Sequence, residues 1–152
     1  MIKILFICHG NICRSTMAEY VMKHLVRQAG VAQNFLIDSA GTSREEIGNG
    51  VHYGTRRKLA EQGIPCGNHR ARQMTREDYD SFDLLIGMDS ANIRNMERIC
   101  GGDPKGKIHK MLEFAGRQGD VADPWYTGDF NATWEDVSEG CRALLEQLTQ
   151  RK

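Results

Sequence analysis

The residues best suited to chemistry lie in one short stretch near the start of the chain, Cys8-His9-Gly10-Asn11-Ile12-Cys13-Arg14-Ser15. The apolar run 4–7 before it is typical of a buried parallel strand, and the residues after it open an amphipathic helix. A loop between a strand and a helix N-terminus offers unpaired N–H groups and partial positive charge to an anion. Arg14 adds a planar, permanently charged group that can hold two oxygens of a phosphate. This pattern predicts a phosphate-binding loop.

Cys8 stands where the N–H groups of the loop, the helix dipole and Arg14 would all favour a thiolate. The thiolate is the nucleophilic form of cysteine, so this position indicates phosphoryl transfer through a phosphocysteine. Gly10 and Asn11 are the residue types that most readily take the left-handed backbone angles of a curled loop. The alternative is an inert core thiol, because free cysteine is among the most buried residue types. The lysine-containing loop of nucleotide hydrolases does not occur in the sequence, so nucleotide hydrolysis is not favoured.

The stretch 8–15 resembles the signature loop of the low-molecular-weight protein tyrosine phosphatases, and the resemblance covers essentially the whole chain. It continues, in the order of the family, through Asp38-Ser39-Ala40-Gly41-Thr42-Ser43, Ile47-Gly48-Asn49, His69-Arg70-Ala71-Arg72-Gln73, Phe82-Asp83, Met88-Asp89 and Asp123-Pro124-Trp125-Tyr126. The resemblance implies that Ser39 and His69 support the loop by holding Asn11. A surface histidine is the alternative for His69.

Asp123 is the candidate for the acid that this chemistry needs. Pro124 fixes one backbone angle, so the carboxylate before it can be held steadily, although Asp-Pro alone is also an everyday turn. Expulsion of a phenoxide needs a proton, and the family places its general acid at this position. Trp125 and Tyr126 would form flat walls for an aromatic substrate, or else pack against the last helix. Ser15 could donate a hydrogen bond to the Cys8 sulfur and improve it as a leaving group.

The predicted cleft departs from the family at Glu45. The segment 41–54 forms one wall of the cleft in the family and usually carries an aromatic residue where this chain has Glu45. The glutamate either weakens stacking against a phosphotyrosine ring, reflects a preference for other sequence contexts, or is a solvated surface residue.

Four functions are possible for a chain with this loop. Relatives that act on phosphoarginine carry Thr in place of Ile12 and lack the aromatic pair after Asp-Pro, so the resemblance favours phosphotyrosine. Arsenate reduction needs two further cysteines as a relay, but Cys66 and Cys100 are far apart in the sequence. A phosphate-binding or phospho-carrier module would explain the loop but leave Asp123 idle. We therefore predict a protein tyrosine phosphatase.

The cysteines predict a reducing compartment and suggest redox control. Five scattered cysteines in a chain of this size favour the cytoplasm. Cys13 is five residues from Cys8 and could trap an oxidised Cys8 as a disulfide, or it could simply be a small residue that fits the loop. The cysteines and histidines lack the paired spacing of a metal site, so we expect no metal and no other cofactor.

Length and charge limit the partners. The chain has 152 residues, which predicts a single domain over 1–152, and its 20 basic and 20 acidic side chains give a formal net charge of zero. We expect no nucleic acid or membrane partner, and the sequence opens without a signal-peptide pattern. The expected partners are a phosphotyrosine-containing protein substrate and, in the active site, inorganic phosphate or a similar oxyanion.

Strands and helices alternate along the chain. Apolar runs predict strands over 4–7, from 35 to an end at 38–39, and over 82–88, and a weaker one over 107–111. Helical spacing and capping residues predict helices from 16 to 28, over 52–62, from 75, from 89 to 100 and over 133–149, with one helical turn at 112–116 and loops at 41–54 and 119–128. This order predicts an α/β fold of three layers. The expected sheet has four parallel strands with flavodoxin-like winding and helices on both faces, and Cys8 lies at its carboxyl edge.

Overall fold

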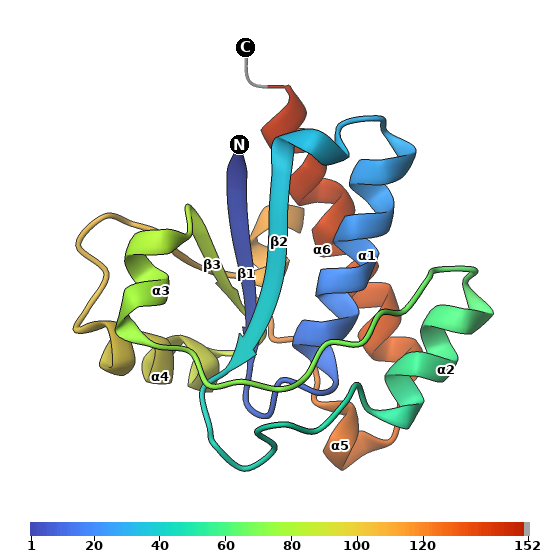
Figure 1. Ribbon diagram of the computed structural model, residues 1–152, viewed down its shortest axis with the longest axis horizontal. Helices are drawn as coiled ribbons and strands as arrows, with labels where there is room; N and C mark the ends of the chain where they lie inside the picture. Colours follow the sequence, from blue (N-terminus) through green and yellow to red (C-terminus); the bar gives the residue numbers. More distant parts are fainter. Residues whose placement is uncertain (151–152) are drawn as a thin grey trace.

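The computed structural model describes residues 1–150. Within these residues the centre is a parallel sheet of four strands in the order β2-β1-β3-β4 (Figure 1). The strands are β1 (Ile2–Cys8), β2 (Phe35–Gly41), β3 (Leu84–Gly87) and β4 (Ile108–Lys110). In the register of the sheet, Ile4 of β1 pairs with Ile37 of β2 and with Leu84 of β3. Parallel strands in this order have flavodoxin-like winding, which confirms the predicted fold class.

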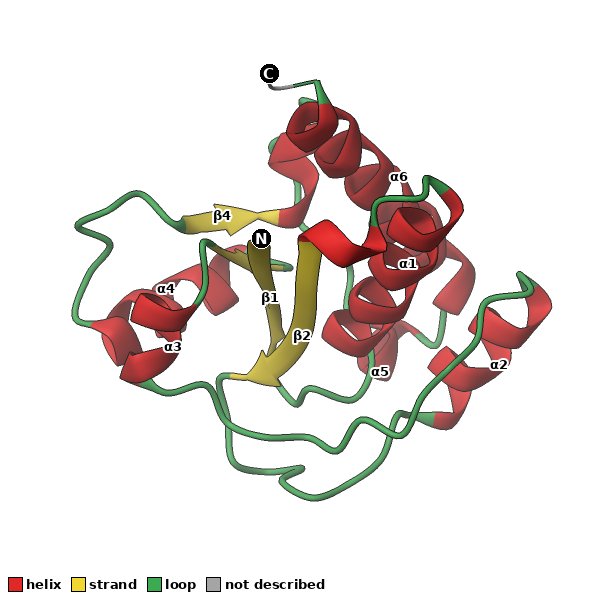
Figure 2. Cartoon of the chain, turned by 45° about the horizontal axis from the view of Figure 1, so that its top comes forward, coloured by secondary structure: helices red, strands yellow, loops and turns green. Residues whose placement is uncertain are grey.

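Helices cover both faces of the sheet (Figures 1 and 2). One face carries α1 (Arg14–Gln28), α2 (Tyr53–Glu61) and α6 (Phe130–Thr149), and the other carries α3 (Arg76–Ser81) and α4 (Ser90–Cys100). Alternate residues of β1 serve the two cores: Ile4 and Phe6 pack with α1 and α6, whereas Leu5 and Ile7 pack with α3 and α4. Because both faces of β1 are buried from Ile4 onward, residues 4–7 form a continuous apolar run without a polar face.

Two predictions near the C-terminus are corrected by the structure. Residues 124–127, expected in a loop, form the short helix α5 (Pro124–Thr127), with Asp123 as its N-cap and Pro124 in the first turn. Proline suits this position because its missing N–H would have no helical partner there. The last helix begins at Phe130 instead of residue 133, because Asp129 accepts a hydrogen bond from the Ala132 N–H and caps an earlier start.

The remaining elements agree closely with expectation. The weak fourth strand forms, and the expected single turn after it is the 3₁₀ helix η2 (Met111–Ala115). A second 3₁₀ helix, η1 (Ala32–Asn34), lies before β2 and was not indicated by the sequence pattern. None of the helices within residues 1–150 has both the length and the apolar character needed to cross a membrane.

The topology collects distant segments at one edge of the sheet. The strands run downward in Figure 1, so the loop after β1, the loop after β2 and the helix α5 meet at the bottom of the molecule. The described ends of the chain lie at the opposite edge. Ligands of open parallel sheets bind beyond the carboxyl ends of the strands, so the lower edge is where a site is expected.

Candidate active site

The 8–15 loop turns back through Asn11, whose φ is 60°. Asn11 is the one residue other than glycine with a positive φ between residues 1 and 150, whereas Gly10 keeps an ordinary negative φ. The expectation that Gly10 takes a left-handed conformation is therefore wrong. A side chain at Gly10 would instead crowd Glu46, because its Cβ would lie 3.3 Å from the Cγ of Glu46.

The residues that follow β2 support the loop through backbone hydrogen bonds. The Thr42 N–H donates to the Cys8 carbonyl at 3.0 Å, and the Ser43 N–H donates to the His9 carbonyl at 3.0 Å. A Cβ on Gly41 would come within 2.8 Å of the His9 carbonyl oxygen, so the strand can approach this closely only with glycine there. These contacts fix the path of the loop where it leaves β1.

The Asn11 side chain is fully buried and uses all of its hydrogen-bonding groups. Its Nδ2 donates to Ser15 Oγ and to Ser39 Oγ, each at 2.9 Å. Its Oδ1 accepts from the Arg72 N–H at 3.1 Å and faces His69 Nε2 at 2.7 Å. The structure thus brings Ser39 and His69 to Asn11. His69 has a side chain only 10 % exposed, so it is not a surface histidine.

Ser15 lies directly beside the sulfur of Cys8. Its Oγ is 3.0 Å from Cys8 Sγ, and both residues are buried. Ser15 Oγ accepts a hydrogen from the amide of Asn11, whose orientation is set by the backbone N–H donor of Arg72 at the amide oxygen. The hydroxyl hydrogen of Ser15 is therefore available to donate to the sulfur, the arrangement that stabilises a thiolate.

Arg14 is the first residue of α1, and its guanidinium is 2 % exposed. Nη1 donates to Asp89 Oδ2 at 2.8 Å and to the Val121 carbonyl at 2.9 Å, and Nη2 donates to Asp123 Oδ2 at 3.4 Å. Burial disfavours the charge, but Cys8, Asp89 and Asp123 outweigh this effect and raise the pKa of Arg14. Nε is buried and has no hydrogen-bond partner among the described residues. A buried cationic N–H donor without a partner fits an oxyanion that accepts from it.

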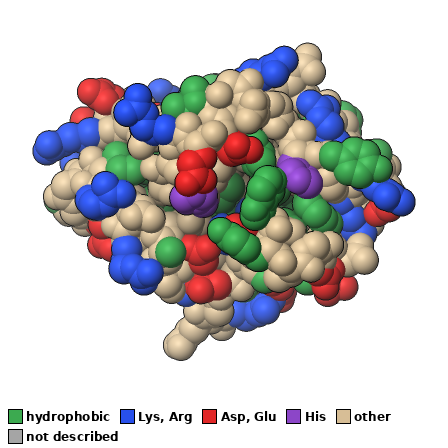
Figure 3. Space-filling model, turned by 90° about the horizontal axis from the view of Figure 1, so that it is seen from below, with side chains coloured by type: hydrophobic (Ala, Val, Ile, Leu, Met, Phe, Trp, Pro, Cys, Tyr) green, Lys and Arg blue, Asp and Glu red, His purple; other side chains and the backbone are tan. Residues whose placement is uncertain are grey.

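A cavity opens over the loop on the lower face of the molecule (Figure 3). Its floor is made by the 8–15 loop, with Cys8, Cys13 and Arg14 among the lining residues. The other lining residues form two walls, an acidic wall of Glu45 and Glu46 and an aromatic wall of Trp125 and Tyr126, and Asp123 lies at the foot of the aromatic wall. Cys8 is therefore buried in the chain and also lines a cavity, unlike an inert core thiol.

The two walls differ in how they are held. The Trp125 and Tyr126 residues are 60 % and 83 % exposed, so packing against the last helix does not account for them. The indole of Trp125 contacts the ring of His52 edge-on, with centroids 5.8 Å apart. On the acidic wall, Glu45 Oε2 lies 2.9 Å from His9 Nε2 of the loop.

A comparison with known proteins identifies the family of this chain. The family model described as low molecular weight phosphotyrosine protein phosphatase matches residues 3–152. The chain belongs to this family. It is 37 % identical over 154 residues to the low molecular weight protein-tyrosine-phosphatase YfkJ of Bacillus subtilis, covering 100 % of this chain and 99 % of that protein. It is 38 % identical over 149 residues to the Homo sapiens low molecular weight phosphotyrosine protein phosphatase, covering 95 % of this chain and 94 % of that protein.

Solved structures agree with this low molecular weight phosphatase fold. The crystal structure of YfkJ from Bacillus subtilis matches with a TM-score of 0.96, 37 % identity and coverage of 100 % of this chain and 97 % of that chain. The crystal structure of DARP, a Drosophila arginine phosphatase, matches with a TM-score of 0.91, 28 % identity and coverage of 99 % and 100 %.

Sequence reasoning missed two residues of the hydrogen-bond network around the 8–15 loop. Asp89 was expected only to cap α4; its Oδ1 does accept from the Asn92 N–H, but its Oδ2 also binds Arg14. Its place at the end of the strand next to β1 was the signal that could have found it. Glu19 is buried and accepts from Ser39 Oγ at 2.6 Å. Its only signal was a charged residue on the apolar side of α1.

The same network contains a group of possible metal ligands. Glu19, Asp38 and His69 each offer a ligand atom, and these atoms lie within 4.8 Å of one another. The carboxylates are already engaged, since Glu19 binds Ser39 and Lys23, and Asp38 accepts from the Ser39 N–H. The arrangement is that of a hydrogen-bonded support for Asn11.

Cys13 belongs to the 8–15 loop and is the N-cap of α1. Burial raises the pKa of Cys13 far above its usual value, and the nearby Cys8 and Asp123 raise it further. At neutral pH this thiol therefore keeps its proton. Cys66 and Cys100 do not line the cavity, so the phosphatase site holds only Cys8 and Cys13.

Proposed function

We propose that this chain hydrolyses phosphotyrosine in proteins, with Cys8 as nucleophile, Arg14 as phosphate ligand and Asp123 as general acid and base. The observation that carries the proposal is that Cys8, whose Sγ lies 3.0 Å from Ser15 Oγ, lines a cavity together with Arg14, whose Nε has no partner among the described residues. A phosphate, or a similar oxyanion, would occupy the floor of this cavity, bound by the N–H groups of residues 9–15 and by Arg14.

The reaction has two steps. In the first, the Cys8 thiolate attacks phosphorus, the bond from phosphorus to the tyrosine oxygen breaks, and Asp123 gives its proton to that oxygen. In the second, Asp123 takes a proton from water as the water attacks phosphorus, and the sulfur–phosphorus bond breaks. The Ser15 hydroxyl stabilises the thiolate that leaves. Arg14 and the loop N–H groups balance the charge of the transferred group throughout.

Asp123 is held ready for this role by two contacts. Its Oδ1 accepts from the Trp125 N–H at 3.0 Å, and its Oδ2 lies 3.4 Å from Arg14 Nη2. The carboxyl group therefore stands at the edge of the phosphate site, on the same side as the aromatic wall. The oxygen of a tyrosine that stacks on Trp125 would leave in the direction of Asp123.

Phosphoarginine is the second candidate substrate, because the chain is similar to the Drosophila arginine phosphatase. The aromatic wall and Ile12 at the floor favour phosphotyrosine. A phospho-carrier would use the loop but leave Asp123 idle, and arsenate reduction would need a relay of two further cysteines, whereas Cys66 and Cys100 do not line the cavity. A catalytic thiol also has to stay reduced, which supports a cytoplasmic location.

Rates on matched peptides that carry phosphotyrosine, phosphoserine or phosphoarginine test this proposal. We expect the phosphotyrosine peptide to react fastest, and Cys8→Ser to lower its rate by at least roughly 10³-fold while the circular dichroism spectrum is retained. Cys66→Ser is the matched control, since Cys66 lies outside the cavity, and it should keep the wild-type rate. A Cys8→Ser variant with near-normal turnover would show that the nucleophile is another residue.

A further inference from the structure

The charges around the cavity are unbalanced for a site that binds a dianion. Glu45, Glu46 and Asp123 contribute carboxylates, and Arg14 is the only Lys or Arg side chain among the lining residues. Arg14 is 2 % exposed and is already paired with Asp89 and Asp123, so it can meet a phosphate at the floor but not a charged group at the rim. The rim of the cavity is therefore acidic at Glu45 and Glu46.

Glu45 and Glu46 are positioned to meet the part of a substrate that lies outside the phosphate site. Glu45 has a side chain that is 71 % exposed, and its contact is the one with His9 Nε2 at 2.9 Å. Glu46 is half-buried against Gly10, and its Oε2 accepts only a long hydrogen bond of 3.5 Å from Asn49 Nδ2. Each carboxylate keeps lone pairs that the protein does not use.

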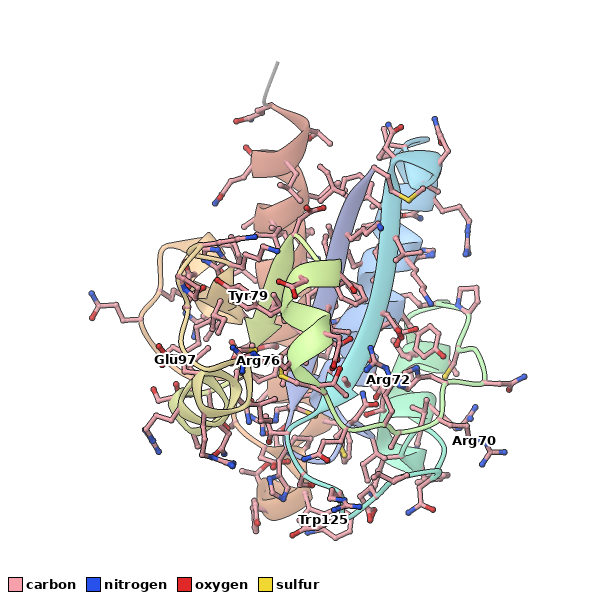
Figure 4. All side chains as sticks on the ribbon, turned by 60° about the vertical axis from the view of Figure 1, so that its left-hand side comes forward. Arg70, Arg72, Arg76, Tyr79, Glu97 and Trp125 are labelled. Carbon is pink, nitrogen blue, oxygen red and sulfur yellow. The ribbon has the colours of Figure 1, made fainter. Side chains whose placement is uncertain are left out.

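The nearby arginines do not neutralise this wall. Arg44 and Arg70 belong to the same region of the fold, but neither lines the cavity. Arg70 extends outward from the molecule in Figure 4 and donates to the Gly48 carbonyl at 3.3 Å. In Figure 3 the acidic side chains lie beside the hydrophobic ones at the centre of the lower face, and the basic side chains lie toward its rim.

We propose that the acidic wall of Glu45 and Glu46 selects phosphotyrosines that have a lysine or arginine next to them in the peptide. The tyrosine ring would lie against Trp125, and the neighbouring cation would reach the carboxylates across the cavity. Peptides with acidic neighbours are disfavoured by repulsion from the same wall. This inference rests on the proposed phosphotyrosine phosphatase function and names the substrate class within it.

The size of the effect follows from the exposure of the wall. Ion pairs between exposed groups change a binding equilibrium by about 2- to 5-fold each, and screening by salt reduces them. With two carboxylates in the wall, kcat/KM for a phosphotyrosine peptide with a basic neighbour should be about 10-fold higher than for one with an acidic neighbour at low ionic strength. The ratio of the two kcat/KM values should approach 1 in about 0.5 M salt.

The test compares three phosphotyrosine peptides that differ only in the flanking residues, which are lysine, alanine or glutamate. For the wild type we expect kcat/KM to fall in that order. In the double variant Glu45→Gln, Glu46→Gln the lysine and glutamate peptides should converge, and the double variant Glu45→Lys, Glu46→Lys should reverse their order. Glu97→Gln, on α4 and away from Trp125 (Figure 4), removes the same charge outside the cavity and should keep the wild-type order.

The outcomes separate this inference from the function on which it rests. If the alanine peptide is not hydrolysed, the proposed phosphotyrosine activity is wrong. If it is hydrolysed but the lysine and glutamate peptides react equally in the wild type, the wall is a solvated surface and the inference is wrong. The inference is also wrong if the preference persists in the double variant, because another group must then provide it.

Discussion

Arg14 Nη2 lies 3.4 Å from Asp123 Oδ2, although the two residues are 109 positions apart in the chain. Arg14 begins α1 and Asp123 caps α5, so the contact joins the floor of the cavity to its aromatic wall. It leaves the Arg14 Nε free for an oxyanion and keeps the Asp123 carboxyl group at the edge of the site. The arrangement supports the same carboxyl group as proton donor in the first step and acceptor in the second.

Replacing Asp123 with asparagine should slow the enzyme in a way that depends on the leaving group. Without the proton donor, kcat for a phosphotyrosine peptide should fall by about 10²- to 10³-fold. A dinitrophenyl phosphate, whose leaving group departs without a proton, should lose much less in the step that forms the phosphocysteine. Single-turnover rates on both substrates measure this. An equal loss on the two would contradict the assignment of Asp123 as general acid.

Asn11 offers a test of the loop geometry with two substitutions at one position. Asn11→Gly and Asn11→Ala both remove the four side-chain hydrogen bonds and should lower the free energy of unfolding by about 2 kcal/mol or more. Alanine should cost about 1 kcal/mol more than glycine, because φ is 60° at this residue. Urea denaturation measures both values. Equal stability of the two variants would mean that the loop relaxes to a negative φ.

Local sequence was enough to predict the centre of the site. The apolar run of β1, the 8–15 loop and the start of α1 are contiguous, so their geometry follows from strand, turn and helix preferences. Ser39 and His69 were expected at Asn11 only through the resemblance to the family, because nothing in their own neighbourhood indicates which loop they support.

Contacts between distant segments could not be predicted from the local sequence around each residue. The pairing of Arg14 with Asp89 spans 75 positions and depends on how β3 lies beside β1. The residues from Asp123 onward suit a turn and a helix start equally, and the structure settles them as α5. At residues 10 and 11 both types tolerate a positive φ, so the sequence could not decide which one takes it.

Cys13 should act only after Cys8 has been oxidised. Its raised pKa keeps it protonated in the resting enzyme, so at neutral pH an alkylating agent should modify Cys8 much faster than Cys13. After mild peroxide, the Cys8 sulfenic acid and the Cys13 thiol should condense to a disulfide with release of water. Peptide mass spectrometry should then find a Cys8–Cys13 peptide two hydrogens lighter than the reduced pair. Sulfinic acid at Cys8 with no disulfide would contradict this.

Asp103 makes the free energy of unfolding depend on pH in the acidic range. Burial opposes its charge, but hydrogen bonds from the Tyr79 hydroxyl at 2.6 Å and the Lys107 N–H at 2.8 Å outweigh burial and lower the pKa of Asp103. Because the pKa is lower in the folded state, this stabilisation is complete above the unfolded value, about 3.9, and is lost as the pH falls through the folded value.

The corresponding variant is Asp103→Asn. It should lower the free energy of unfolding by about 1 kcal/mol near pH 6, a modest value because the carboxylate is only partly buried and solvent screens its charge. The difference from the wild type should close as the pH falls through the lowered pKa of Asp103. Urea denaturation at a series of pH values measures it, and a difference that stays constant with pH would assign the loss to packing instead of charge.

The most direct test of the account is to find where the phosphoryl group resides during turnover. The Asp123→Ala variant, mixed with a dinitrophenyl phosphate and quenched in acid within one turnover, should carry one phosphate, and peptide mass spectrometry should locate it on Cys8. The matched double variant Asp123→Ala, Cys8→Ser should carry none. A phosphate on any other side chain, or hydrolysis with no covalent phosphate at any quench time, would contradict a phosphocysteine mechanism for this chain.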